Sequence, residues 1–98
     1  DALLDLSQPA DVLARRVRAF QPWPGTYITW EGGILKILKA HAAAGVSRVG
    51  ERLVQSGLPA LGTAEGWLVL DWVQPAGKKG MPGGAFLQGA RGWEQPHA

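Results

Sequence analysis

The stretch RAFQPWPGTYITWEGGILKILK, residues 18–39, decides the fold of this chain. It runs from the end of a helix through a Pro-Trp-Pro-Gly corner into a pair of strands. Thr26–Glu31 is rich in β-branched and aromatic residues, which favour a strand. Gly32-Gly33 predicts a two-residue hairpin turn that leads into Ile34–Ala43. That second run does not alternate cleanly and would also fit a helix, but the hairpin context and the isoleucines favour a strand with a bulge.

The residues before the corner predict a helix over 8–20. Leu13, Val17 and Phe20 recur at helical spacing and form one apolar stripe. We expect Ser7 to cap the start of this helix, because a hydroxyl can accept from the free N–H groups of the first turn. The proline after the helix ends it, since the residue before a proline is pushed out of the α region.

Downstream, the pattern predicts three more strands and a short helix: strands over 52–56, 58–61 and 67–74, and a helix over 82–89. Pro59 would confine the second of these strands to a sheet edge. Together the elements predict a mainly β fold, a small antiparallel OB-like Greek-key barrel preceded by an N-terminal helix and followed by a short C-terminal helix. We expect residues 1–6 to be residual linker, residues 7–90 to form the domain and residues 91–98 to be a tail.

Five tryptophans in 98 residues indicate large rings that fill a small barrel. Alternation places Leu68 and Leu70 on one face with Trp72. We expect Trp72 and Trp30 in the core, because a small barrel needs large rings to fill it. Trp23 lies between two prolines and is expected to be a plug that fixes the angle between helix and barrel. Trp93 is expected to anchor an otherwise frayed tail.

Composition limits the function classes. The chain fits one domain, and its formal charge of +2 is far from that of a dedicated nucleic-acid binder. The lack of cysteine excludes disulfides and thiolate chemistry and fits a cytoplasmic protein. No apolar run is long enough for a membrane span, and we expect no membrane partner. The start at Asp1 indicates a processed product or an excised fragment.

Catalytic and metal sites find little support in the sequence. His41 and His97 stand alone, without a carboxylate or a second ligand at metal-like spacing, and we expect both to be solvated. The serines lie in no nucleophile motif, and no carboxylates are paired by sequence. We therefore expect no catalytic residue and no metal ligand in this chain.

Basic residues supply the functional signal. They cluster at positions 15, 16 and 18 of the helix, at Lys36 and Lys39, and at Lys78-Lys79 between glycines. Lysine and arginine that neutralise phosphates release counterions and so bind nucleic acid without reading bases. The alternative is that they are solubilising side chains whose stems cover apolar surface. Exposed aromatic rings such as Trp23, Tyr27 and Trp30 could stack on bases, although core packing is favoured for at least two of them.

Four motifs carry a family resemblance: RAFQPWPG at 18–25, GILKILKA at 33–40, QPAGKKGM at 74–81 and FLQG at 86–89. Their order and spacing resemble the C-terminal domain of methionyl-tRNA formyltransferase over residues 7–90. The Pro-Trp-Pro-Gly corner is the specific part. Residues 45–62 match poorly, and Gly80 occupies a position that often carries a side chain in the family, sometimes a basic one.

The resemblance implies that this chain is the tRNA-binding part of an enzyme whose separate N-terminal domain holds the catalytic residues. The parent would transfer a formyl group from 10-formyltetrahydrofolate to initiator methionyl-tRNA, with no cofactor in this chain. The implied partners are that tRNA and the N-terminal catalytic domain of the same protein, in a cytoplasmic monomer. The expected RNA-binding residues are Lys78, Lys79, Lys36, Lys39, Arg16 and Arg18.

Two other functions stay open. Related formyltransferases attach the same kind of domain to other chemistry, where the barrel is partly a structural spacer. A stand-alone barrel that binds single-stranded nucleic acid is the second alternative. The Gly-Lys-Lys loop favours the tRNA enzyme over the first, and the modest net charge counts against the second.

Overall fold

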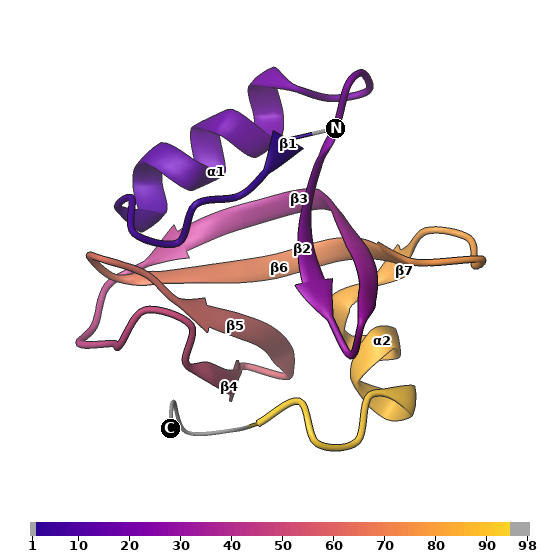
Figure 1. Ribbon diagram of the computed structural model, residues 1–98. Helices are drawn as coiled ribbons and strands as arrows, with labels where there is room; N and C mark the ends of the chain where they lie inside the picture. The colour runs from indigo at the N-terminus through magenta and orange to yellow at the C-terminus, as the bar shows by residue number, and fades with distance from the viewer. Residues whose placement is uncertain (1, 95–98) are drawn as a thin grey trace.

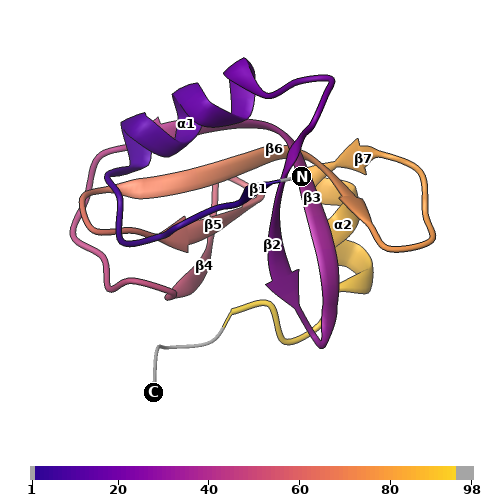
Figure 2. The same cartoon turned by 45° about the horizontal axis from the view of Figure 1, so that its top comes forward.

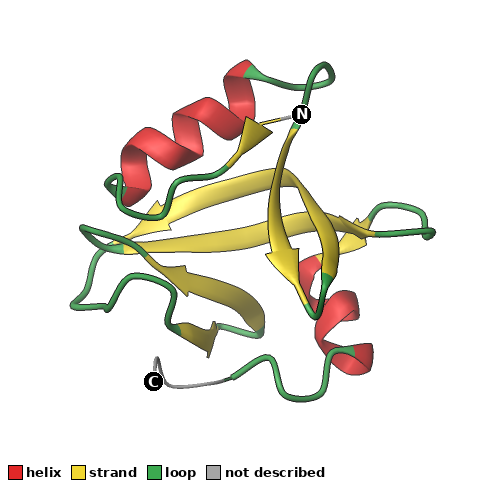
Figure 3. Ribbon diagram, viewed as in Figure 1, coloured by secondary structure: helices red, strands yellow, loops and turns green. Residues whose placement is uncertain are grey.

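A computed structural model describes residues 2–94. Within them the chain forms β1 (Ala2–Leu3), α1 (Ala10–Ala19), β2 (Thr26–Trp30), β3 (Gly33–Ala43), β4 (Arg52–Gln55), β5 (Leu58–Gly62), β6 (Trp67–Pro75), β7 (Met81–Pro82) and α2 (Gly83–Gly89). Figure 3 shows the resulting distribution of helix and strand. The predicted class is confirmed: the fold is mainly β, with a helix before the long strands and a short helix after them.

The strands form one sheet in the order β1-β2-β3-β6-β5-β4, and β7 pairs with β6 beside this path (Figure 1). All pairs are antiparallel except β1 with β2, which run parallel. The sheet is therefore mixed, and it does not close. The OB-like arrangement is an open one, and the antiparallel prediction fails only at β1.

Residues expected as linker form the edge of this sheet. The Ala2 N–H donates to the Gly25 carbonyl and the Leu4 N–H to the Tyr27 carbonyl, both at 2.9 Å. Leu4 is only 4% exposed and belongs to the main core. The segment before α1 is thus held by backbone pairing and by burial of a leucine.

Helix α1 begins two residues later than expected and without a side-chain cap. Its N-cap is Pro9, which offers no hydroxyl. Ser7 instead donates from its Oγ to Asp5 Oδ1 at 2.6 Å, so the predicted capping role is wrong. The apolar stripe is confirmed, because Leu13 and Val17 are fully buried in the main core.

The hairpin between β2 and β3 turns one residue earlier than predicted. Trp30 pairs with Gly33, which leaves Glu31 and Gly32 as the loop. Both have positive φ, 50° and 77°, as a type I′ turn requires. Strand β3 then continues to Ala43, so the strand interpretation is confirmed and the helical one is excluded.

Strand β5 lies inside the sheet, between β4 and β6, although it contains Pro59. The prediction of an edge strand is wrong. Pro59 pairs with Val54 one step from the closing pair of a two-residue hairpin, where ladder hydrogen bonds are not made. The pairing with β6 begins only at Ala60, so the missing N–H of the proline is not needed on either side.

A bulge in β6 reverses which face its residues occupy. Lys39 of β3 pairs with Trp72 and Ala40 pairs with Leu70, so Asp71 is an extra residue on β6. Such an extra residue shifts the inside–outside alternation by one position. Leu70 is fully buried, whereas Trp72 is 41% exposed. The prediction that Trp72 belongs to the core is therefore wrong.

The C-terminal segment closes the core with an aromatic cluster. Trp93 is 2% exposed and its ring centroid lies 5.7 Å from that of Phe86 in α2 and 5.1 Å from that of Trp30. The anchor predicted at Trp93 is confirmed. Trp30 is only partly buried and packs against the core from its margin. Helix α1 lies above β3 and α2 lies below β7 in Figure 1, and Figure 2 shows both helices from another side.

The corner between α1 and β2 is fixed by polar contacts and not by its tryptophan. Trp23 is 81% exposed, so the predicted plug is wrong. The Gly25 N–H donates to the Phe20 carbonyl at 2.9 Å, and Gln21 Nε2 donates to the Ile37 carbonyl at 3.1 Å. These bonds tie the helix end directly to β2 and β3.

Candidate nucleic-acid interface

Lys36 lies on the outer face of the sheet. Its neighbours Leu35 and Ile37 are 1% and 0% exposed, so the alternation of the strand turns the Lys36 side chain away from the core. In the ladder Lys36 pairs with Tyr27 of β2 on one side and with Gln74 of β6 on the other. This row of three residues crosses β2, β3 and β6, and its lysine is exposed.

A bulge in β3 brings Lys39 to the same face. Ile37 pairs with Val73 and Lys39 with Trp72, which makes Leu38 an extra residue on β3. Without it, alternation from Ile37 would turn Lys39 into the core. With it, the exposed Lys39 stands directly opposite the half-exposed Trp72. The sheet therefore presents two cations and one indole on one side.

Lys78 and Lys79 lie in the β6–β7 loop, which projects from the end of β6 (Figure 1). The Lys78 N–H donates to the Pro75 carbonyl at 3.1 Å, and Gln74 Nε2 donates to the Lys78 carbonyl at 2.9 Å. Because Gln74 pairs with Lys36, the loop is tied next to the Lys36 row. Both loop lysines are exposed.

Gly80 seats the loop against the sheet. A Cβ at this position would lie 2.9 Å from Leu38 Cδ1 and 3.2 Å from Trp72 Nε1. A side chain here would have to displace the leucine or the indole. The glycine at this position thus lets Trp72 and Leu38 lie close to the loop.

Arg16 and Arg18 do not lie on the same side of α1. They are two positions apart on α1, and residues at this spacing point to different sides of a helix. Arg16 lies over the Phe20 ring with its guanidinium carbon 5.6 Å from the centroid, and it lines a cleft with Asp5. Arg18 is exposed on the other flank. Of the six predicted residues, the structure gathers the four lysines around β3 and the β6–β7 loop.

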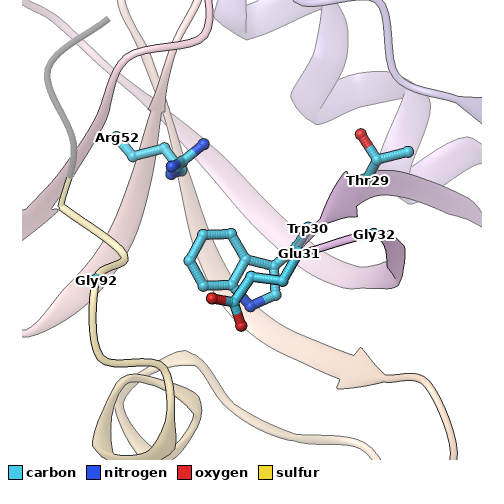
Figure 4. A pocket seen from close by; sticks show the side chains of 6 residues that line it. All are labelled: Thr29, Trp30, Glu31, Gly32, Arg52 and Gly92. Atoms are coloured by element: carbon cyan, nitrogen blue, oxygen red, sulfur yellow. The ribbon is translucent and has the colours of Figure 1, made fainter.

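A separate pocket of about 420 Å³ lies beside the β2–β3 turn and is lined by Thr29, Trp30, Glu31, Gly32, Arg52 and Gly92 (Figure 4). The Arg52 guanidinium carbon lies 4.9 Å from the Trp30 ring centroid, and Arg52 Nε donates to the Trp93 carbonyl at 2.9 Å. This arginine joins the hairpin to the C-terminal segment. These contacts join parts of the fold, so they account for a structural role of Arg52.

His41 is exposed, as expected for a solvated histidine, but the expectation that it has no carboxylate beside it is wrong. Its Nδ1 lies 2.8 Å from Asp71 Oδ2, because the β3–β6 ladder and the bulge at Asp71 bring the two together. His97 lies outside the described residues. Among residues 2–94 no group of three His, Cys, Asp or Glu side chains could hold a metal ion. Within the same residues no helix is long and apolar enough to cross a membrane.

Comparison with known proteins gives the family. A model of the formyl transferase C-terminal domain matches residues 1–91. This chain belongs to that family. Methionyl-tRNA formyltransferases of Granulibacter bethesdensis and Myxococcus xanthus resemble this formyl transferase C-terminal domain closely. The first is 47% identical over 91 residues, covering 91% of this chain and 28% of that protein. The second is 46% identical over 88 residues, covering 88% of this chain and 28% of that protein.

The domain therefore spans under a third of the length of the curated relatives it matches. Among solved structures, HypX from Aquifex aeolicus in complex with tetrahydrofolic acid superposes with a TM-score of 0.69 at 22% identity. The match covers 96% of this chain and 18% of that one. At this identity the likeness shows a shared fold for the formyl transferase C-terminal domain.

Sequence reasoning missed two members of the candidate interface, Trp72 and Gln74. Both residues lie at the interface because the β3–β6 register pairs them with Lys39 and Lys36, and no local sequence pattern specifies that register. Alternation alone sent Trp72 to the wrong face, because the bulge at Asp71 leaves no mark in the apolar pattern.

Proposed function

We propose that this domain binds initiator methionyl-tRNA and positions it for N-formylation by a catalytic domain outside this chain. The observation that carries the proposal is the gathering of Lys36, Lys39, Lys78 and Lys79 around one side of β3 and the β6–β7 loop. The relatives named above as methionyl-tRNA formyltransferases supply the substrate class.

The mechanism is electrostatic positioning. Lysines on a rigid sheet neutralise phosphates and release their counterions, which gives affinity without base specificity. Lys36 and Lys39 are fixed by strand pairing, whereas Lys78 and Lys79 sit in a loop that is pinned at Pro75 and Gln74. Holding the tRNA in one orientation turns a bimolecular encounter into an effectively unimolecular reaction at the aminoacyl end.

The helix contributes in a secondary way. Arg16 and Arg18 extend the positive surface to the two flanks of α1, so that only one of them at a time can face the same RNA segment as the lysines. The formyl group would come from 10-formyltetrahydrofolate held by the catalytic domain. The present domain would act on the position of the tRNA and not on the reacting atoms, in a cytoplasmic monomer.

A structural role is the second candidate. HypX shares the fold, which shows that this architecture occurs in proteins other than the methionyl-tRNA formyltransferases. In that case the domain would be a spacer, and its lysines would serve solubility. The two functions differ in one measurable property, the affinity of the lysine surface for tRNA.

The test is a titration of the domain with initiator tRNA at low salt. Replacing Lys78 and Lys79 by alanine is expected to weaken binding several-fold, because two phosphate contacts are lost. The matched control replaces Arg48 and Arg91, which are exposed and lie outside the predicted set. It removes the same charge and is expected to change the affinity much less. Equal losses in both double variants would favour the structural role.

A further inference from the structure

We propose that Trp72 is a stacking platform for an unpaired base of the bound RNA, with Lys39 and Lys36 beside it to hold the adjoining phosphates. This inference rests on the proposed function and adds a contact type to it. Phosphate contacts alone do not touch the bases and so do not read whether a base is paired. A stacking residue selects the places where a base is free to leave its helix.

The indole stands in a row that crosses three strands. Trp72 pairs with Lys39 of β3 on one side and with Pro82 of β7 on the other. Residues directly opposite in an antiparallel ladder project from the same face. All three are exposed. The row therefore offers a ring with a cation on one side and a proline on the other.

The Trp72 ring lies close to Gly80 of the β6–β7 loop, where Leu38 also packs. Leu38 Cδ1 and Trp72 Nε1 both lie near Gly80, at 2.9 Å and 3.2 Å from where its Cβ would be. An indole packed in this way has fewer rotamers to lose when a base stacks on it. Pre-ordering of this kind lowers the entropic cost of binding.

Exposing part of the Trp72 ring to water costs free energy that its burial would recover. It is 41% exposed because the bulge at Asp71 turns it away from the core that Leu70 enters. A fold that only needed a spacer would gain by burying such a ring. The double bulge, at Leu38 and Asp71, places the tryptophan and Lys39 on one face together.

RNA fits this face better than a protein partner. Lysines are depleted in the centres of protein–protein interfaces, whereas aromatic rings interleaved with cations are the usual surface for single-stranded nucleic acid. The net charge of the chain is only +2, so the positive charge on this face comes from local clustering. In the β3–β6 ladder, only the Ile37–Val73 pair separates the Lys36–Gln74 pair from the Lys39–Trp72 pair.

The experiment compares a 12-nucleotide single-stranded RNA with the blunt duplex of the same sequence. Trp72→Leu keeps an apolar side chain and removes the π surface, and it is expected to weaken single-strand binding by about fivefold or more. Trp72→Phe is expected to keep most of the affinity. Binding to the duplex should change less than twofold in either variant. Thermal unfolding shows whether each variant retains the fold.

The control is Trp23→Leu, which removes an indole that is 81% exposed and outside the Trp72 row. It is expected to leave single-strand affinity within twofold. A folded Trp72→Leu variant that binds single strands as well as the parent would overturn the proposal, as would an equal loss in Trp23→Leu. If tRNA binding persists in those cases and still depends on Lys78, the proposed function stands and only the stacking role falls.

Discussion

The indole Nε1 of Trp93 donates a 2.9 Å hydrogen bond to the carbonyl of Leu53, forty residues away in the sequence. The Trp93 carbonyl in turn accepts from Arg52 Nε at 2.9 Å. Neighbouring residues of β4 therefore bind the indole N–H and the backbone carbonyl of Trp93. The C-terminal segment is part of the fold because its ring is buried and both of its polar groups are satisfied.

Removing the Trp93 indole N–H should destabilise the domain even if a ring remains. Trp93→Phe leaves the partly buried Leu53 carbonyl without this donor and removes part of a buried ring, and we expect a loss of about 1–3 kcal/mol in the free energy of unfolding. Urea denaturation measures it. Trp23→Phe is the matched control and should change stability by less than about 0.5 kcal/mol, because that ring is exposed. Equal effects at the two sites would contradict the anchoring role.

The contact between α2 and β6 depends on a glycine. A Cβ on Gly83 would collide with the Leu70 carbonyl and lie 2.8 Å from Pro59 Cδ. We expect Gly83→Ala to cost about 1–3 kcal/mol, since backbone must move to relieve the overlap. Gly89→Ala, at the end of the same helix, meets nothing within 4 Å and should be neutral or stabilising by up to about 1 kcal/mol. A neutral Gly83→Ala would show that α2 is not seated as described.

Thr63 closes the turn before β6. It is 1% exposed, and its Oγ1 lies 2.8 Å from the Glu65 carbonyl and 2.9 Å from the Gly66 carbonyl, to which it donates. Thr63→Val keeps the shape and removes the hydroxyl, so we expect a loss of about 1–3 kcal/mol in thermal or urea unfolding. Thr29→Val, at an exposed position of β2, serves as the control and should lie within about 0.5 kcal/mol of the parent.

The turn before α1 should be visible in the titration of Asp5. The Ser7 hydroxyl and then the Ser7 backbone N–H lower the pKa of this carboxyl, and Arg16 adds the smallest contribution. A depressed folded-state pKa gives stability that is present above the unfolded value and lost as pH falls through the folded one. Ser7→Ala should raise the Asp5 pKa, followed by carboxyl NMR, more than Arg16→Gln does. The reverse order would contradict the assigned cause.

The fold was predictable where local chemistry decides it. Leu13 and Val17 repeat at helical spacing, and the β-branched run from Thr26 ends at a glycine turn, so helix and hairpin follow from neighbours in sequence. The resemblance added the order of the elements. The parallel strand β1 escaped prediction because two residues, Ala2 and Leu3, carry no periodicity.

The candidate interface was predictable only in its charges. Lys36 and Lys39 stand out in the sequence, yet their common face depends on the extra residue at Leu38. The sequence pattern predicts Trp72 in the core and Trp23 as a plug, and both are exposed. A bulge or a corner changes direction without changing composition, so only the register between distant strands places these rings.

Whether the lysine surface binds tRNA through phosphates is tested most directly by the salt dependence of binding. The affinity of the domain for initiator tRNA is measured at several salt concentrations, and its logarithm is plotted against that of the salt. Binding through phosphates predicts a steep negative slope that becomes shallower by about one for each of Lys78 and Lys79 replaced by alanine. A flat plot, or a slope that the double variant leaves unchanged, would contradict it.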